Sequence, residues 1–268
     1  MKLPIALSIA GSDSGGGAGI QADLKTFASL KVHGTSVITC LTAQNPNRII
    51  GMQPCRPAMV RAQLAAVFEE LPPLAVKTGM LFSSAIIREV AAFLACARKT
   101  PLLIVDPVMV ATSGSHLIEP KAIDMMKKVL LPMATLVTPN LAEAEALTGF
   151  RIRRPEDLRK AARELQQKFG CATLVKGGHI TDSKTATDIF CDGKTELMLS
   201  APFIRGIATH GTGCLYSAAI AAYCALGCNL VDAVRLAKNY TTRAIAQSIS
   251  ASGHSVLNSF WNFGMHNH

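Results

Sequence analysis

Short apolar runs alternate with longer amphipathic segments along most of the chain. The apolar runs predict strands at Ile5–Ala10, Ser36–Leu41, Ala75–Thr78, Leu102–Asp106, Leu136–Thr138 and Thr173–Lys176. The amphipathic segments predict helices at Gly19–Leu30, Pro57–Glu70, Ser83–Arg98, Pro120–Val129, Asn140–Thr148, Pro155–Phe169, Gly213–Leu226 and Leu230–Ser248. This alternation is typical of an α/β fold, in which helices flank both faces of a central, largely parallel sheet.

The sequence predicts one domain that covers residues 1–268. Hydrophobic residues make up 49% of it, and no Pro/Ser-rich linker, low-complexity block or internal repeat divides it. The apolar run Leu3–Ala10 is short for a signal peptide and contains Pro4. Asp106 and Pro107 interrupt the strongest candidate for a membrane span. We therefore expect a cytoplasmic protein that has no membrane partner.

The formal net charge of +9 raises the question of a nucleic-acid partner. Basic residues concentrate between Arg151 and Arg163, where Glu156 and Asp157 interleave with them and aromatic residues are nearly absent. This pattern predicts a solvated helix face and no nucleic-acid partner. A basic chain suits an anionic small ligand equally well.

Eight cysteines raise the question of disulfides or a metal site, but none are spaced as a CxxC pair. Cys224 and Cys228 would share a helix face only if the helix continued past Gly227. We expect free, mostly buried thiols.

The glycine-rich turn His210–Cys214 runs directly into an apolar helix. Two glycines allow successive N–H groups to converge on an oxyanion, and the positive end of the helix dipole strengthens such a cradle. A helix N-terminus also lowers the pKa of a thiol from about 8.5, so Cys214 is a candidate base. A glycine-capped turn with a core cysteine explains the same residues.

Polar residues follow several predicted strands, namely Gly11, Asp106, Asn140 and Lys176–Gly178. The carboxyl ends of parallel strands meet at one edge of a sheet, where α/β proteins bind ligands. Two nucleotide motifs fail, because Asp188 replaces a Walker A glycine and Tyr216 replaces a GxGxxG glycine. The pattern suits phosphoryl transfer without a P-loop.

Seven motifs, in family order, resemble hydroxymethylpyrimidine/phosphomethylpyrimidine kinase. They are Ala10–Lys25, Thr42–Asn45, Lys77–Leu81, Asp106–Ala111, Pro139–Glu143, Val175–His179 and His210–Cys214. The resemblance implies a ribokinase-like fold, a homodimer, and Mg²⁺ with ATP as co-substrate. It also implies phosphorylation of 4-amino-5-hydroxymethyl-2-methylpyrimidine to its monophosphate and then its diphosphate, in thiamine biosynthesis. The chain departs from the family at Leu215, where threonine is frequent, and matches loosely over residues 253–258.

On the substrate side, the resemblance assigns the aminopyrimidine to Gln44, whose amide can both accept and donate. It places Asp23 near the substrate alcohol and makes Gly11, Met80 and Val108 walls of the pocket. Without the resemblance, Gln44 reads as a loop amide bonded to backbone, Asp23 as a helix-surface carboxylate and Met80 as core.

On the nucleotide side, the resemblance assigns the phosphate contact to Lys176. It places the Asp106 carboxylate near the transferred phosphoryl group and Thr212 among the residues that bind the nucleotide. It assigns Mg²⁺, held mainly through water, to Asn140 and Glu143. A solvated lysine, a turn before Pro107 and a helix capping box explain these residues without a ligand.

The resembling kinases carry a cysteine at the position of Cys214. We hypothesise that Cys214 helps to accept the hydroxymethyl proton, while the amides of Gly211–Gly213 and Mg²⁺ stabilise the transferring charge. We further expect the amides of Gly15–Gly17 to form a nest for the phosphate of the second substrate, although a flexible lid explains these glycines as well. Two other functions stay open. One is a kinase for pyridoxal or pyridoxine, and the other is a non-catalytic sensor of nucleotides or thiamine precursors.

Overall fold

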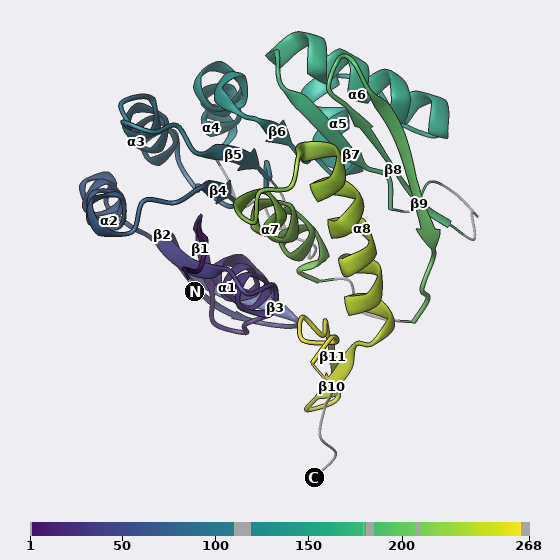
Figure 1. The fold of residues 1–268 in the computed structure, drawn as a ribbon, viewed down its shortest axis with the longest axis horizontal. Helices are drawn as coiled ribbons and strands as arrows, with labels where there is room; N and C mark the ends of the chain where they lie inside the picture. Colours follow the sequence, from purple (N-terminus) through teal and green to yellow (C-terminus); the bar gives the residue numbers. More distant parts are fainter. Residues whose placement is uncertain (1, 110–118, 179, 181–184, 207–209, 264–268) are drawn as a thin grey trace.

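A nine-stranded sheet runs through the residues that this computed structural model describes, which are 2–109, 119–178, 180, 185–206 and 210–263. The strand order is β3-β2-β1-β4-β5-β6-β7-β8-β9 (Figure 1). In chain order the strands are β1 (Ile5–Asp13), β2 (His33–Asn45), β3 (Arg48–Pro54), β4 (Ala75–Thr78), β5 (Leu102–Val105), β6 (Leu136–Val137), β7 (Ala172–Lys176), β8 (Thr185–Cys191) and β9 (Glu196–Pro202). Neighbours from β2 to β7 are parallel, whereas the pairs β2-β3, β7-β8 and β8-β9 are antiparallel. The expected largely parallel sheet is confirmed.

Helices cover both faces of this sheet. They are α1 (Gly19–Ser29), α2 (Pro57–Glu70), α3 (Ser84–Ala95), α4 (Pro120–Met125), α5 (Leu141–Thr148), α6 (Pro155–Phe169), α7 (Thr212–Ala225) and α8 (Leu230–Ala246). A π-helical turn, Met126–Leu130, and a 3₁₀ turn, Leu131–Met133, extend α4. A small hairpin, β10 (Ile249–Ala251) and β11 (His254–Val256), follows α8.

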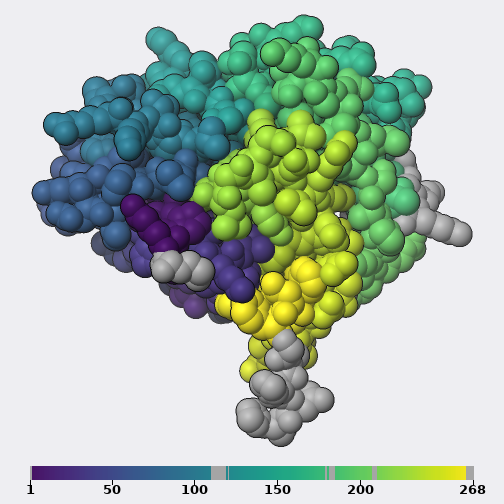
Figure 2. Space-filling view, in the orientation of Figure 1, coloured from purple at the N-terminus to yellow at the C-terminus, as the bar shows by residue number. Residues whose placement is uncertain are grey.

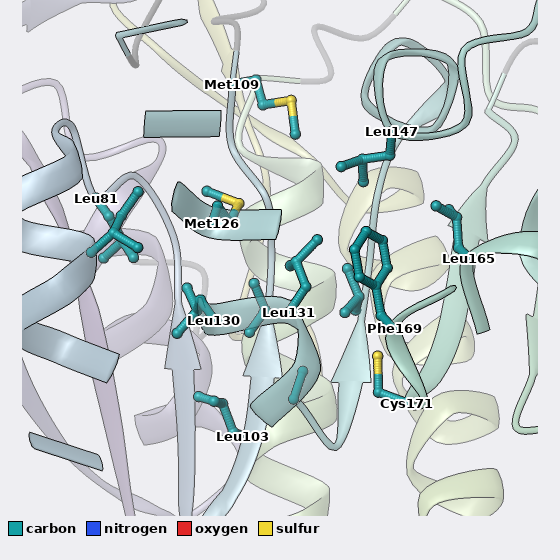
Figure 3. Close-up of a cluster of buried hydrophobic side chains, with 14 of the residues drawn as sticks. Leu81, Leu103, Met109, Met126, Leu130, Leu131, Leu147, Leu165, Phe169 and Cys171 are labelled. Carbon is teal, nitrogen blue, oxygen red and sulfur yellow. The ribbon is translucent and has the colours of Figure 1, made fainter. Parts of the chain in front are cut away.

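The core consists of two hydrophobic clusters, one on each face of the sheet. Helices α2 to α6 contribute to the first cluster, part of which is shown in Figure 3, and α1, α7 and α8 contribute to the second. Successive strand residues point to opposite faces, so Val76 joins the first cluster and Ala75 the second. Helix α8 lies on the outside of the second layer (Figure 2). The apolar runs are continuous because the central strands are buried on both faces.

The expected central strands and all eight helices are present, with small differences at their ends. Strands β1 and β2 extend further, to Asp13 and Asn45, and α3 begins after Ser83, whose side chain accepts a hydrogen bond from the amide of Ile86. The sequence analysis missed β3, β8, β9 and the terminal hairpin. In β3, β9 and the first strand of the hairpin, most residues are exposed or half-buried, so their apolar patterns are weak. In β8 only the last four residues are buried, and Asp188 is one of them.

The basic segment lies on the surface, as expected. Arg151 pairs with Glu145, and Arg159 and Arg163 both pair with Glu196 on β9. Helix α7 ends before Gly227, which separates the region of Cys224 from that of Cys228.

All eight cysteines are free. Four of them are buried, and Cys96 is exposed, so the expectation of buried thiols holds in part. Among the residues that the structure describes, no helix combines the length and the apolar character needed to cross a membrane.

Candidate active site

One cavity opens where the carboxyl ends of the parallel strands meet the N-terminus of α7. Most of the expected site residues line it, although they come from segments far apart in sequence. These residues are Gly11, Gln44, Met80, Asp106, Val108, Asn140, Glu143, Lys176, Gly211, Gly213 and Cys214. Asp23 and Thr212 do not line it. The expected convergence at this edge of the sheet is confirmed.

The apolar end of the cavity depends on a close approach between β1 and the segment after β4. A Cβ atom at Gly11 would lie 2.4 Å from the terminal methyl group of Met80, so a larger residue there would displace the end of the Met80 side chain. Met80 is buried, with 8% of its surface exposed. Val108 follows Asp106 on the adjacent wall. Met80 is therefore a core residue and a cavity wall at once.

Gln44 contributes a side-chain amide to the same region. Its Oε1 accepts a hydrogen bond from the Thr42 hydroxyl at 3.2 Å, and its Nε2 lies 3.4 Å from Nε2 of His210. These partners are side chains, so the interpretation of Gln44 as an amide bonded to backbone is wrong. Because both contacts are long, the amide can replace them with hydrogen bonds to a ligand in the cavity.

The polar end of the cavity contains a buried ion pair. Lys176 Nζ donates to Asp106 Oδ1 at 2.8 Å, and the carboxylate also accepts from the hydroxyls of Thr138 and Ser217. Burial lowers the pKa of Lys176, but Asp106 and Glu143 outweigh it and raise the pKa above its ordinary value. The interpretation of Lys176 as a solvated strand-end lysine is wrong. Its ammonium stays charged and faces the cavity.

Asn140 and Glu143 form the expected capping box at the start of α5. The Asn140 side chain accepts from the amide of Glu143 at 2.9 Å, and the Glu143 carboxylate accepts from the amide of Asn140 at 2.8 Å. Burial raises the pKa of Glu143 to about 7 even though Lys176 opposes this shift. The box explains both residues locally, and it also holds the carboxylate on the cavity wall.

The glycine turn before α7 is tightly constrained. Gly211, the N-cap residue, has a φ of 81°, and a Cβ there would lie 1.8 Å from the carbonyl oxygen of Gly17. A Cβ at Gly213 would lie 3.2 Å from Lys176 Nζ. Gly211 is therefore required by its contact with backbone, whereas Gly213 keeps the space beside the lysine ammonium free.

Thr212 is placed differently from what was expected. Its hydroxyl is buried and has no hydrogen-bond partner among the described residues, and the side chain does not line the cavity. The hydroxyl does not face the cavity in this structure, and the assignment of Thr212 to nucleotide binding stays a prediction. The first turn of α7 points the hydroxyl into the protein.

The surroundings of Cys214 shift the pKa of its thiol in the direction opposite to the one expected. Burial raises the pKa of the thiol above its ordinary value, Lys77 opposes this shift, and Asp23 and Asp106 add to it. The helix N-terminus does not compensate for the lost hydration of a thiolate. A lowered pKa for Cys214 is therefore wrong.

Asp23 is neither a surface carboxylate nor part of the cavity wall. Its carboxylate accepts from Lys77 Nζ at 2.9 and 2.8 Å and from the hydroxyl of Ser8. Both side chains of the ion pair are fully buried. Lys77, which the sequence analysis did not single out, lines the cavity between Asp23 and the reacting groups. A signal was present, because Lys77 interrupts a buried four-residue strand.

The glycine loop after β1 binds an anion of the protein itself. The amides of Gly15, Gly17 and Ala18 donate to the Asp13 carboxylate, and the amide of Gly16 donates to the Asp13 carbonyl oxygen. The nest expected to be free for a phosphate is thus filled by Asp13, and that prediction is wrong here.

His210 lies beside this loop. Its Nε2 is 3.4 Å from Asp13 Oδ2. Burial raises the pKa of Asp13, but the hydrogen bonds from His210 and the loop amides lower it overall. Asp13 and His210 both line the cavity and were missed by sequence reasoning, because they lie 197 residues apart.

The chain is similar to known kinases over nearly its whole length. A hydroxymethylpyrimidine/phosphomethylpyrimidine kinase from Synechococcus elongatus is 46% identical over 265 residues, which cover 97% of this chain and 99% of the relative. The solved phosphomethylpyrimidine kinase of Clostridium difficile is 40% identical with a TM-score of 0.80, covering 90% of this chain and 99% of that one.

A pyridoxal kinase from Staphylococcus aureus, solved with AMP-PCP and pyridoxal, is 32% identical with a TM-score of 0.89, covering 99% of this chain and 96% of that one. These solved kinases confirm the expected ribokinase-like architecture. A family model described as phosphomethylpyrimidine kinase matches residues 13–258. The chain belongs to the phosphomethylpyrimidine kinase family.

Proposed function

We propose that the chain transfers the γ-phosphoryl group of ATP to 4-amino-5-hydroxymethyl-2-methylpyrimidine and then to the resulting monophosphate, within thiamine biosynthesis. One observation carries this proposal. A single cavity has the Gln44 amide, apolar walls, Lys176, the space beside Gly213 and Cys214 in one lining. Family membership supports the identity of the substrate, and the AMP-PCP complex of a similar kinase supports ATP.

The cavity can bind the flat pyrimidine through two kinds of contact. Met80 and Val108 supply apolar walls, and the bare backbone at Gly11 allows the ring to lie close. The Gln44 amide can accept from the exocyclic amino group and donate to the neighbouring ring nitrogen. These contacts orient the hydroxymethyl group toward the polar end.

In the first transfer, the substrate's hydroxymethyl oxygen attacks the γ-phosphorus, its proton passes to the thiolate form of Cys214, and the bond from phosphorus to the ADP oxygen breaks. Lys176 supplies positive charge to the transferring group, and the backbone amides around Gly211 and Gly213 donate to its oxygens. Phosphoryl transfer depends mainly on positioning and charge, so alignment by Cys214 contributes more than its basicity.

The residues at the polar end also fit Mg²⁺ bound largely through water. Among the described residues, no group of three His, Cys, Asp or Glu side chains forms a direct metal cage. Mg²⁺ instead usually keeps several waters and uses one or two carboxylates together with phosphate oxygens. Asp106 and Glu143 supply such carboxylates, and Asn140 fixes Glu143 through the capping box. When bound, the ion would neutralise phosphate charge.

We also propose that residues 1–268 act as a single kinase domain, within a homodimer, in the cytoplasm. The resemblance to the family supports these three features. Light scattering on the purified protein tests the dimer, since a monomer mass at micromolar concentration contradicts it.

The function is tested by incubating the purified protein with Mg-ATP and either the hydroxymethylpyrimidine or pyridoxal, and following products by mass spectrometry. We expect pyrimidine monophosphate and then diphosphate. Pyridoxal phosphate without pyrimidine products would favour the second candidate function, which the structural similarity to pyridoxal kinases supports. Ligand binding without any product would favour a sensor.

The role of Cys214 is tested separately. Cys214→Ala removes the proton acceptor, so we expect a large loss in kcat with little change in KM, and Cys214→Asp tests whether another base restores turnover. Full turnover by Cys214→Ala would eliminate the proposed role of this thiol.

A further inference from the structure

Lys77 is a fully buried lysine that has no role in the proposed reaction as described above. It lies on β4, where all four residues are buried, and no part of its side chain is exposed. Burying an ammonium is costly unless it is paired, and lysine is among the residues least often buried. The ammonium of Lys77 in the core therefore points to a functional role.

The position of Lys77 Nζ is fixed from two sides. Both oxygens of the Asp23 carboxylate accept from it, at 2.9 and 2.8 Å, and Ser8 anchors one of these oxygens. A Cβ atom at Gly79 would lie 3.1 Å from Nζ, so the glycine keeps space open beside the ammonium. An ammonium has three donors, and the two that bind Asp23 leave one for the cavity that Lys77 lines.

The cavity side of Lys77 is where Cys214 lies. Both residues line the same cavity, and α7, which carries Cys214, belongs to the same layer of helices as α1, which carries Asp23. The charged groups that act on the Cys214 thiol are Lys77 from β4, Lys176 from β7, Asp23 from α1 and Asp106 after β5. Of these, Lys77 favours the thiolate most, and both carboxylates oppose it.

We propose that Lys77 is a positioning residue whose ammonium, anchored by Asp23, stabilises negative charge on Cys214 Sγ. This inference rests on the proposed function, in which the thiolate accepts the hydroxymethyl proton as the alcohol oxygen bonds to phosphorus. Lys77 neither gains nor loses a proton in this step. Its charge compensates the electron pair on sulfur until the proton arrives, in a site where burial otherwise disfavours a thiolate.

The test measures the thiol directly, without ATP or substrate. We expect the pH dependence of iodoacetamide alkylation, quantified at Cys214 by peptide mass spectrometry, to report the fraction of thiolate. Lys77→Met removes the cation, so the alkylation midpoint moves up by about one pH unit or more and the rate below it falls about tenfold. Asp23→Asn keeps the Lys77 anchor as a neutral amide, so the midpoint moves down and alkylation becomes faster.

The two variants are expected to move the alkylation midpoint in opposite directions, which separates a change in charge from a change in packing. Loosened packing would expose Cys214 in both variants and change both rates in the same direction. Such a result, or an unchanged midpoint in either soluble variant, would overturn the proposal. If Lys77→Met does not fold, Lys77→Gln replaces it, because its neutral amide can still bond to Asp23 while the loss of the cation must raise the midpoint.

Two controls belong to the experiment. Lys238→Met breaks a comparable buried pair, Lys238 with Asp188 at 2.7 Å, which lies outside the cavity lining, so the Cys214 midpoint stays unchanged. Alkylation of the exposed Cys96 in each sample normalises the reagent. Because labelling needs no turnover, a failure of this inference is distinguishable from a failure of the proposed kinase activity, which product analysis alone decides.

Discussion

Replacing Gly211 with alanine tests whether the turn before α7 is held by contact with the glycine loop after β1. The added Cβ would lie 1.8 Å from the carbonyl oxygen of Gly17 and 2.9 Å from its carbonyl carbon. Real Cβ atoms essentially never approach another heavy atom closer than 3.0 Å. One of the two segments must therefore move by about 1 Å, a displacement that can cost about 100-fold in rate at an active site.

The backbone contributes a second and separable penalty. Gly211 has a φ of 81°, and placing a Cβ in that region costs about 1–2 kcal/mol. Gly227, just after α7, has a φ of 92°, and a Cβ added there would have no atom within 4 Å. Gly227→Ala therefore carries the same strain without the contact. We expect Gly227→Ala to melt about 2–8 °C lower with unchanged kcat/KM.

The assay compares kcat/KM for pyrimidine phosphorylation and the melting temperature in the two alanine variants and the parent protein. We expect kcat/KM of Gly211→Ala to fall by about 100-fold, far more than that of its matched control. Equal kcat/KM in both variants would refute the claim that this contact positions the cradle. Addition of ATP would then also stabilise both variants equally against heat.

Three further changes probe the rest of the cavity. Gln44→Ala removes the amide that is proposed to recognise the pyrimidine, so we expect kcat/KM for the pyrimidine to fall about 10- to 100-fold, while KM for ATP, measured in the same titrations, stays constant. Lys176→Met removes the phosphate-facing charge, so KM for ATP rises and Lys176→Arg restores it only in part; an unchanged KM for ATP contradicts this role. Glu143 has a pKa raised by burial from 4.5 to about 7. The folded protein therefore keeps a proton that the unfolded chain releases, and the free energy of unfolding falls as pH rises across that window. In urea titrations from pH 4.5 to 7.5, Glu143→Gln has a flatter dependence, and parallel curves would refute the shift.

The centre of the fold was predictable because its strands are buried on both faces. A strand such as β5 produces an unbroken apolar run between amphipathic segments, and this signal depends only on composition and order. The edges were not predictable in the same way. β3 is exposed at all but one residue, and in β9 exposed and half-buried residues alternate, so hydrophobicity does not distinguish these strands from loops.

The site was predictable as far as it follows strand topology. Asp106 and Lys176 come after strands of the same parallel region, so the fold class alone brings them to one edge. Asp23 shows a signal that was available and not used. It lies in phase with Ile20 and Phe27 on the buried face of α1, where a carboxylate needs a buried partner. The identity of that partner, Lys77, lies 54 residues away and requires the structure.

The electrostatics of the cavity do not follow from the chain's net charge of +9. Each lysine that lines it is balanced by one carboxylate, Lys77 by Asp23 and Lys176 by Asp106. Under the proposed function, a phosphate is therefore attracted less by excess positive charge than by the amides of the turn and the open space at Gly213. The same pairing explains why the pKa of Cys214 is raised, because paired cations compensate only part of the cost of burying a thiolate. Sequence rules for a helix N-terminus describe the local dipole, whereas burial and pairing are properties of the folded chain and decide the outcome here.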